Sequence, residues 1–529
     1  MIRLPGLAFP LDTPPSDYPA AAARLLGIAP AAITACRPVR RAVDARRRDQ
    51  VHLVLTLDVA VNGDERALLQ RCKHPGAAYI EESAPAPLPR AKNPPARRPV
   101  VVGAGPAGLF AALTLAEMGI APLLLEQGRD AESRRRDVDR FFREGVLNPA
   151  SNVQFGEGGA GTFSDGKLNT GIKSPHARRV LDAFVRCGAP PAIAYEARPH
   201  IGTDHLVRVV QNLRREIIAL GGEVRFETPV TGLEIENGAV RGLRAGGQMI
   251  ETEAVVLAIG HSARDTFTML QEAGVLMQAK PFSIGARIEH RQDWLNRAQY
   301  GRFAGHPALG AAEYRLAAHL PNGRGVYTFC MCPGGTVVAA ASEPGGVATN
   351  GMSLYARDGE NANSALLVDV RPEDFPSDDP LAGVAFQRLW ERRAYELAGG
   401  DYRAPAQQVG DFLAGRASRA LDGVRPSYRP GVTPADLRAC LPDFVTASMA
   451  EGIRRFGVQL RGFDDPGAVL TGVETRSSSP VRIPRDASGQ ANLRGLYPAG
   501  EGAGYAGGIL SAATDGVRVA LWVGEKEGA

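Results

Sequence analysis

Cysteine is scarce in this 529-residue sequence, and the six cysteines show neither the spacing of a disulfide framework nor that of a zinc site. Charge of one sign is scarce as well, because the formal net charge is only +4, which by itself implies no polyanionic partner. No long apolar core follows Met1, so we expect no signal peptide and a cytoplasmic protein. These absences leave a globular protein of two or three domains as the expected class.

Long hydrophobic runs are also few. The stretch 99–125 carries one charge, Glu117, and by hydropathy alone could be taken for a membrane span. Its glycines, together with Pro106 and Pro122, favour a buried βαβ unit instead. We therefore expect no contact with a membrane.

This stretch has the pattern of a dinucleotide-binding fold. An apolar β-branched run at 100–102 predicts a buried strand, a predicted helix covers 109–118, and a second apolar run at 123–125 ends at Glu126. Between the first strand and the helix lies G-x-G-x-x-G, whose glycines permit a tight turn, close approach of a pyrophosphate and helix–strand packing. The glutamate would bind the ribose hydroxyls and repel a 2′-phosphate.

A second segment near the C-terminus, 496–502, resembles the other half of the same site. The G-x-G-x-x-G at 502–507 lies too close to the C-terminus to begin a second nucleotide domain, and we interpret it as a turn before a helix over 507–519. The two segments are almost 400 positions apart, so the chain must leave the cofactor domain and return to it. That arrangement favours FAD over NAD, with Glu501 near the ribityl hydroxyls.

The predicted fold class is α/β, with a two-segment Rossmann-like FAD-binding domain, an inserted mixed α+β substrate domain and a small N-terminal βαββ module. In the module, Ser16 would cap a helix that runs to Leu26, and alternating apolar residues over 51–61 predict a strand. The expected boundaries are 1–82 for the module, 83–98 for a proline-rich linker, 99–275 and 491–529 for the cofactor domain, and 276–490 for the substrate domain.

Six arginines lie between Arg37 and Arg48. They could form a surface for RNA or another anionic partner. Asp44 and Asp49 are interleaved with them, however, and no aromatic residues are interspersed for base stacking. We favour a solvated hairpin turn.

Three further segments are candidates for the chemistry. A glycine-rich loop at 155–168 could approach a flavin closely. Cys330 and Cys332 are the only close cysteine pair, and in a strand both thiols would share one face; they could be a redox pair or two small core residues. The segment 474–482 offers Glu474, Arg476 and Arg482, whose planar guanidinium groups could hold a carboxylate or phosphate, or could belong to a surface loop.

The sequence resembles the bacterial family of predicted, largely uncharacterised FAD-dependent dehydrogenases, the NAD(P)/FAD-dependent oxidoreductases. The resemblance runs in order over nearly the whole chain, and long strings carry it: FGEGGAGTFSDGKL (155–168), AIGHSARDT (258–266), PFSIGARIEH (281–290), YTFCMCPGG (327–335), TNGMS (349–353), SYRPGV (427–432), GVETRSSSPVRI (472–483) and GLYPAGEGAGYAGGILSAATDG (495–516). It implies FAD in a two-segment nucleotide domain with an inserted mixed-sheet domain, and it supplies no substrate.

The resulting expectation is an FAD-dependent oxidoreductase that moves hydride between a small molecule and the flavin N5, with NAD(P)H as a transient donor. The alternatives are a flavin-dependent RNA-modifying enzyme and a non-catalytic flavin redox sensor. No C-x4-C pair is present, which argues against a disulfide reductase. We expect no metal site, and the oligomeric state stays open. The catalytic candidates are Cys330, Cys332, Glu474, Arg476 and Arg482, and the candidates for binding the cofactor are Gly103, Gly105, Pro106, Ala107, Gly108, Glu126, Gln127, Gly158, Gly159, Gly161, Thr162, Ser164, Lys167, Val230, Gly260, His261, Ser262, Gly500, Glu501, Gly507, Gly508 and Ile509.

Overall fold

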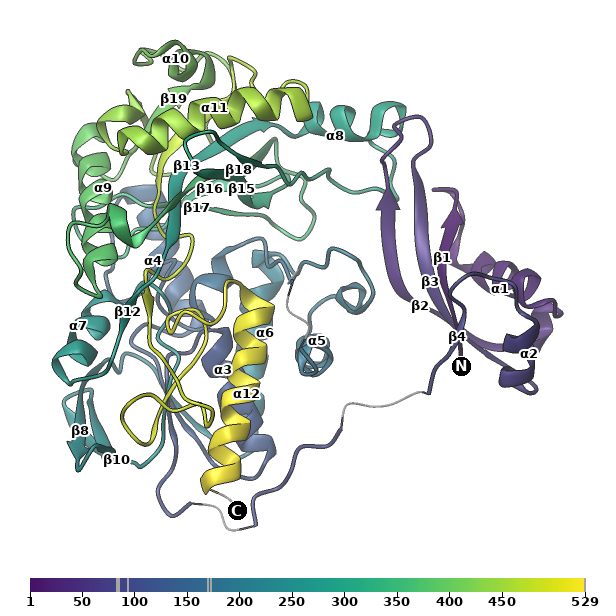
Figure 1. Ribbon diagram of the computed structural model, residues 1–529, viewed down its shortest axis with the longest axis horizontal. Coiled ribbons are helices and arrows are strands. Elements are labelled where there is room, and N and C mark those ends of the chain that lie inside the picture. The colour runs from purple at the N-terminus through teal and green to yellow at the C-terminus, as the bar shows by residue number, and fades with distance from the viewer. Residues whose placement is uncertain (82–85, 93–94, 169–170, 172–173, 528–529) are drawn as a thin grey trace.

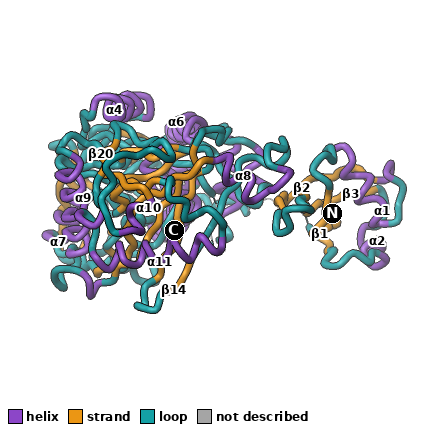
Figure 2. Tube along the Cα trace, turned by 90° about the horizontal axis from the view of Figure 1, so that it is seen from above, coloured by secondary structure: helices purple, strands orange, loops and turns teal. Residues whose placement is uncertain are grey.

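The computed structural model describes residues 1–81, 86–92, 95–168, 171 and 174–527. The chain forms a large body with a smaller N-terminal unit beside it (Figures 1 and 2). Pro85 and Pro94 of the predicted linker lie outside the described residues, as do 528 and 529. Within the described ranges, none of the helices combines the length and apolar composition that crossing a bilayer requires.

The N-terminal unit is a four-stranded antiparallel sheet with two helices. Its sheet has the order β2-β3-β1-β4, that of a split βαβ fold. The alternation over 51–61 is confirmed, because Leu53, Leu55 and Leu57 are buried in one face of β3. The structure adds a second helix and a short fourth strand to the predicted βαββ order: β1 (Ile2–Phe9), α1 (Tyr18–Leu26), β2 (Ile33–Asp44), β3 (His52–Val61), α2 (Glu65–Arg71) and β4 (Ala78–Tyr79).

The predicted cap of α1 is wrong. The N-cap residue is Asp17, which makes no side-chain cap, and the Ser16 hydroxyl donates to its carboxylate at 3.3 Å. Pro15 begins a short 3-10 turn over Pro15–Asp17. The α-helix therefore begins one residue later than the sequence indicates.

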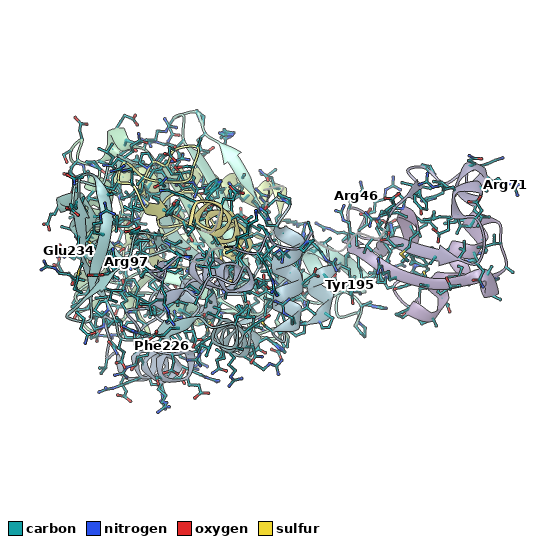
Figure 3. The ribbon with its side chains drawn as sticks, turned by 90° about the horizontal axis from the view of Figure 1, so that it is seen from below. Arg46, Arg71, Arg97, Tyr195, Phe226 and Glu234 are labelled. Carbon is teal, nitrogen blue, oxygen red and sulfur yellow. The ribbon has the colours of Figure 1, made fainter. Side chains whose placement is uncertain are left out.

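The arginine-rich segment lies in β2 and the following turn. Part of it docks on the body instead of being solvated. The Arg41 N–H donates to the Tyr195 carbonyl at 2.7 Å, Ala197 N–H donates to the Arg41 carbonyl at 2.8 Å, and the Arg41 guanidinium donates to Glu196 at 2.7 Å. Figure 3 shows Tyr195 on the side of the body that faces this unit. RNA docking on this segment stays a hypothesis, and Arg41 is already engaged.

The cofactor half of the body is a five-stranded parallel sheet of order β23-β11-β5-β6-β7. Strand β23 comes from the C-terminal segment and pairs with β11, and the last helix packs beside the helix of the glycine motif (Figure 1). The chain thus leaves this sheet and returns to it. Its elements are β5 (Val100–Val102), α3 (Pro106–Glu117), β6 (Leu123–Leu125), α4 (Ala131–Glu144), α5 (Ala177–Arg186), α6 (Thr203–Ala219), β7 (Glu223–Arg225), β8 (Val230–Glu236), β9 (Ala239–Ala245), β10 (Gln248–Glu251), β11 (Val255–Leu257), α7 (Arg264–Glu272), β23 (Leu496–Pro498) and α12 (Ile509–Glu527).

The inserted half is a mixed sheet of order β14-β15-β18-β13-β21-β19-β20, in which only β19 and β20 pair in parallel among the described residues. Strand β12 pairs with β22 where the insertion leaves and rejoins the cofactor half. The α/β fold class with a mixed insertion is confirmed. Its elements are β12 (Gln278–Ala279), β13 (Phe282–Arg291), α8 (Gln292–Tyr300), β14 (Ala317–His319), β15 (Gly325–Cys332), β16 (Thr336–Ala339), β17 (Thr349–Met352), β18 (Asn361–Val370), α9 (Ala382–Ala398), β19 (Ala404–Gln408), α10 (Val409–Ala414), β20 (Val432–Pro434), α11 (Asp443–Gln459), β21 (Val469–Glu474) and β22 (Val481–Arg482).

Candidate functional site

A cavity of about 320 Å³ lies where the two halves of the body meet. One end lies at the carboxyl ends of β5, β6, β11 and β23, and the other reaches the inserted sheet at Phe329, Cys330 and Glu474. After β5 the chain crosses to β6 on one side, whereas β11 and β23 lie on the other side. Such a switch point leaves a crevice at the carboxyl edge of a parallel sheet, which is where nucleotides bind.

The first end of the cavity is a cradle of backbone. Gly103 has φ +101°, and a Cβ there would lie 2.4 Å from the Ala258 carbonyl oxygen. A Cβ on Gly108 would lie 1.8 Å from the Gly103 carbonyl oxygen. With any other residue at position 108, helix α3 could therefore not begin so close to this turn. At Gly507 a Cβ would meet nothing within 4 Å, because that glycine borders the cavity. The N-terminus of α3, at Pro106, faces the same space and offers a site for phosphate.

Glu126 lines the cavity and also fastens the cradle. Its buried carboxylate accepts hydrogen bonds from the N–H groups of Ala104 at 2.8 Å, Gly128 at 2.9 Å and Gly156 at 3.0 Å. The glycine turn and the 155–168 loop are therefore joined through one side chain. A carboxylate has about four lone-pair positions, so one is left for a ribose hydroxyl.

Arg134 on α4 fixes the glycine-rich loop from behind, and sequence reasoning missed it. Its fully buried guanidinium donates to the carbonyls of Asn152, Val153 and Glu157 at 2.7–2.9 Å. Burial lowers the pKa of Arg134 to about 10, so the group stays charged at neutral pH. The sequence gives no signal for this role, because Arg134 lies in a run of arginines on an amphipathic helix.

The C-terminal segment is fastened by a second residue that the sequence analysis missed. The Asp515 carboxylate accepts from the Gly500 N–H at 2.8 Å and is paired with Arg485 at 2.7 Å. Beside this turn, His261 Nδ1 lies 3.6 Å from the Glu501 carboxylate. His261 also lines the cavity, and its buried Nε2 has no hydrogen-bond partner among the described residues.

The far end of the cavity is built from side chains of the inserted sheet around Arg287, another residue that sequence reasoning missed. This fully buried residue of β13 donates to the Glu474 carboxylate at 3.2 Å, to Asn363 Oδ1 at 2.6 Å and to the Cys330 carbonyl at 2.9 Å. Its guanidinium also lies 3.6 Å from Cys332 Sγ. One cation thus serves both a carboxylate and a pair of thiols.

The electrostatics of this end favour proton transfer near neutral pH. Burial raises the pKa of Glu474 to about 7, although Arg287 opposes the shift, and the neighbouring Cys330 adds to it. A hydrogen bond from Cys332 lowers the pKa of Cys330 to about 6, with the charges of Arg287 and Lys167 acting in the same direction. The pKa of Cys332 is raised by that hydrogen bond and by burial.

The cysteine pair lies at an irregularity of β15, so the strict alternation from which one shared face was predicted does not hold along this stretch. The register of β15 against β18 shifts between Phe329 and Cys332, and Cys330 has φ +42°. This bulge turns Cys330 toward the cavity and leaves Cys332 buried behind it. Pattern alone could not reveal the shift.

The two arginines of 474–482 do not present free guanidinium groups to the cavity. Arg476 donates to both oxygens of Glu391, at 3.0 and 2.8 Å, and to Ser342. Arg482 is absent from the lining among the described residues, and its guanidinium lies over the Tyr505 ring at 4.5 Å. An anion held by this pair stays a prediction that the geometry does not favour, because internal partners already bind Arg476.

Most of the candidate residues line the cavity. Of the catalytic candidates, Cys330, Glu474 and Arg476 line it, whereas Cys332 and Arg482 do not. Four cofactor candidates stand behind the lining: Gly108, Gly158, Thr162 and Gly500. Those that line it are Gly103, Gly105, Pro106, Ala107, Glu126, Gln127, Gly159, Gly161, Ser164, Lys167, Val230, Gly260, His261, Ser262, Glu501, Gly507, Gly508 and Ile509.

This arrangement fits FAD. The glycine cradle and the α3 N-terminus would hold the pyrophosphate, Glu126 the ribose, and His261 and Glu501 other polar groups of the cofactor. The 155–168 loop and the Gly507–Gly508 turn would lie along the ring.

Two family models agree with this fit. Residues 137–312 match the model described as FAD dependent oxidoreductase, and residues 281–477 match FAD-dependent protein, C-terminal domain-like. Residues 1–60 match a domain of unknown function.

Comparison with known proteins gives one long match. An uncharacterized protein of Clostridium beijerinckii is 49% identical over 490 residues, which cover 92% of each chain. Likeness to solved structures is weaker and carries no argument. CtdE in complex with FAD is 13% identical with TM-score 0.32, covering 82% of this chain and 91% of that one. An L-proline dehydrogenase from P. horikoshii is 12% identical with TM-score 0.34, covering 82% and 95%. From its sequence matches, the chain belongs to a family of uncharacterised FAD-dependent oxidoreductases, and its cofactor is FAD.

Proposed function

We propose that this protein oxidises or reduces a small organic molecule bound at the far end of the cavity, with Glu474 moving the proton that accompanies hydride transfer. Bound FAD supplies the hydride chemistry at N5. The chain supplies the cradle that holds the cofactor and the wall that holds the substrate, which includes Phe329, Cys330, Asn350 and Ser477.

The observation that carries this proposal is the Glu474 carboxyl. It is buried, lines the cavity and has a pKa of about 7. A proton-transfer group works best when its pKa lies near the operating pH. Arg287 fixes the carboxyl from the side of the sheet, so both protonation states are available in one position.

The wall favours a substrate with a flat apolar part and hydrogen-bonding groups. Phe329 is an aromatic side chain that remains 38% exposed at this wall. In the described lining, the lysine and arginine side chains are Lys167 and Arg476, and both have acidic partners, Asp165 and Glu313 for the first and Glu391 for the second. A strongly anionic substrate would find no unpaired cation of these types there.

The first test is anaerobic and spectroscopic. The visible spectrum of the purified protein is recorded, and NADH, NADPH and then a panel of small organic molecules are added. Bleaching of the flavin band by a nicotinamide would identify NAD(P)H as donor, and bleaching by a panel member would identify a substrate. Protein that carries no flavin and binds none would overturn the proposal.

The second test separates proton transfer from folding. Glu474→Gln should keep its flavin but slow reduction by the identified donor or substrate by about 10²-fold or more. Glu289→Gln is the matched control, because Glu289 is also a buried carboxyl of this sheet with a raised pKa but lies outside the lining. Equal rates in the two variants would exclude Glu474 from the reaction.

A further inference from the structure

The bulge at the end of β15 brings two thiols together at the wall of the cavity. Between Phe329 and Cys332, β15 uses one residue more than its partner β18. In a regular strand, alternate Cα atoms would lie about 6.6–6.8 Å apart, which is the outer limit for a disulfide. Cys332 Sγ lies 3.3 Å from the Cys330 carbonyl oxygen, so the second thiol is folded back toward the first cysteine.

The surroundings divide the pair into a nucleophile and its partner. Arg287 contacts the Cys330 carbonyl and Cys332 Sγ, and Lys167 donates to the carbonyl of Met331 between them. The hydrogen bond from Cys332, together with the charges of these two cations, lowers the pKa of Cys330 to about 6, against burial and the charge of Asp165. These directions favour the thiolate at Cys330 and leave the proton on Cys332.

Other cysteines of the chain lack this environment. Burial raises the pKa of Cys187 to about 12, with Glu216 adding to the shift, and burial also raises the pKa of Cys36 and Cys440. Compared with these three cysteines, the pair at 330 and 332 is thus the more readily oxidised site.

We propose that Cys330 and Cys332 are a redox-active dithiol that a hydroperoxide closes to a disulfide at the wall of the FAD cavity. The Cys330 thiolate attacks the peroxide, the O–O bond breaks, and the departing oxygen takes a proton, which leaves a sulfenic acid. Cys332 then gives up its proton and attacks the Cys330 sulfur, the S–O bond breaks, and water leaves. Two thiols and one hydroperoxide yield a disulfide, an alcohol and water, or two waters from hydrogen peroxide.

Closing the disulfide would also affect the acid–base group. The charge of Cys330 helps to raise the pKa of Glu474, and a disulfide removes that charge. Oxidation should therefore lower the pKa of Glu474 and move the pH profile of turnover to lower pH. This consequence rests on the proposed function, whereas the disulfide itself does not.

The test uses the full-length protein as purified, fully reduced and then treated with hydrogen peroxide. After denaturation and alkylation, intact mass and peptide mapping should show loss of two hydrogens and protection of Cys330 and Cys332 alone. Cys332→Ser should stop at a sulfenic acid on Cys330 that dimedone traps, and Cys330→Ser should abolish the reaction. Cys187→Ser is the matched control and should react as the unmodified chain does.

Several outcomes would overturn the proposal. They are full alkylation of Cys330 after peroxide, a disulfide that involves another cysteine, or an alkylation rate of Cys330 that shows no rise with a midpoint near pH 6. These readouts need neither turnover nor a flavin signal, so their failure is distinct from failure of the proposed function.

Discussion

The two ends of the FAD cavity are built by different means. The cofactor end consists of backbone, with Gly103, Gly108 and Gly507 in turns where a side chain would clash or intrude. The substrate end consists of side chains, with Arg287, Cys330 and Glu474 drawn from three strands of the inserted sheet. One site can therefore combine a contiguous motif, which can be recognised in the sequence, with a cluster of side chains that comes together only on folding.

The largest effect should come from breaking the backbone end. Gly103→Ala would force a positive φ on alanine and place its Cβ 2.4 Å from the Ala258 carbonyl oxygen, so we expect loss of both flavin and thermal stability. Gly507→Ala should fold normally and lose affinity for FAD, because its methyl group would enter the cavity. Flavin absorbance and melting temperature check both, and equal melting temperatures for the two variants would contradict the comparison.

Removing the buried cation at the side-chain end should lower stability nearly as much. Arg287→Leu leaves the Glu474 carboxyl and Asn363 without their partner, and losing one member of a buried ion pair costs about 3–5 kcal/mol. We expect a lower free energy of unfolding in urea. In the double variant, Arg287→Leu with Glu474→Gln, we expect this free energy to decrease by less than the sum of the two single decreases. A decrease equal to that sum would show that the two side chains are not coupled.

The pH dependence of stability should reflect the titration of the Glu474 carboxyl. Its folded pKa of about 7 lies above its ordinary value of 4.5, so the folded protein binds this proton more tightly than the unfolded chain. This contribution is fully present below about pH 4.5 and is lost as the pH rises through 7, on the order of 3 kcal/mol. The free energy of unfolding, measured from pH 4.5 to 8, should therefore decline less in Glu474→Gln; parallel curves would argue against the shift.

The smallest effect concerns the contact outside the cavity. Arg41→Ala removes a half-buried ion pair with Glu196 and should weaken docking of the N-terminal unit by about 0.5–1 kcal/mol. We expect faster proteolysis between the unit and the body, and no change in flavin content. Arg46→Ala is the control, because that exposed arginine pairs only with Asp44 among the described residues and should leave the proteolysis rate unchanged.

The cofactor end could be predicted because its requirements are local. A G-x-G-x-x-G between an apolar strand and a helix, an acid after the second strand and a glycine-rich loop each occupy a few adjacent residues. Arg134 and Asp515 could not be predicted, because they bind backbone groups 23 and 15 positions away, outside any local motif, which only folding brings near. The cap at Ser16 was wrong since an adjacent proline turn delays the helix.

By itself the sequence determined the α/β class, the return of the chain to its nucleotide sheet and the identity of the cofactor, because periodicity and contiguous glycines encode them. Tertiary structure alone decided that Arg287 lies between Glu474 and the cysteine pair, and that Arg476 is occupied by Glu391. A bulge of one residue decided which thiol faces the cavity. The physical reason is that the pKa of a side chain, and whether its hydrogen-bonding groups already have partners, depend on burial and on neighbours from distant strands. No local sequence pattern specifies these neighbours.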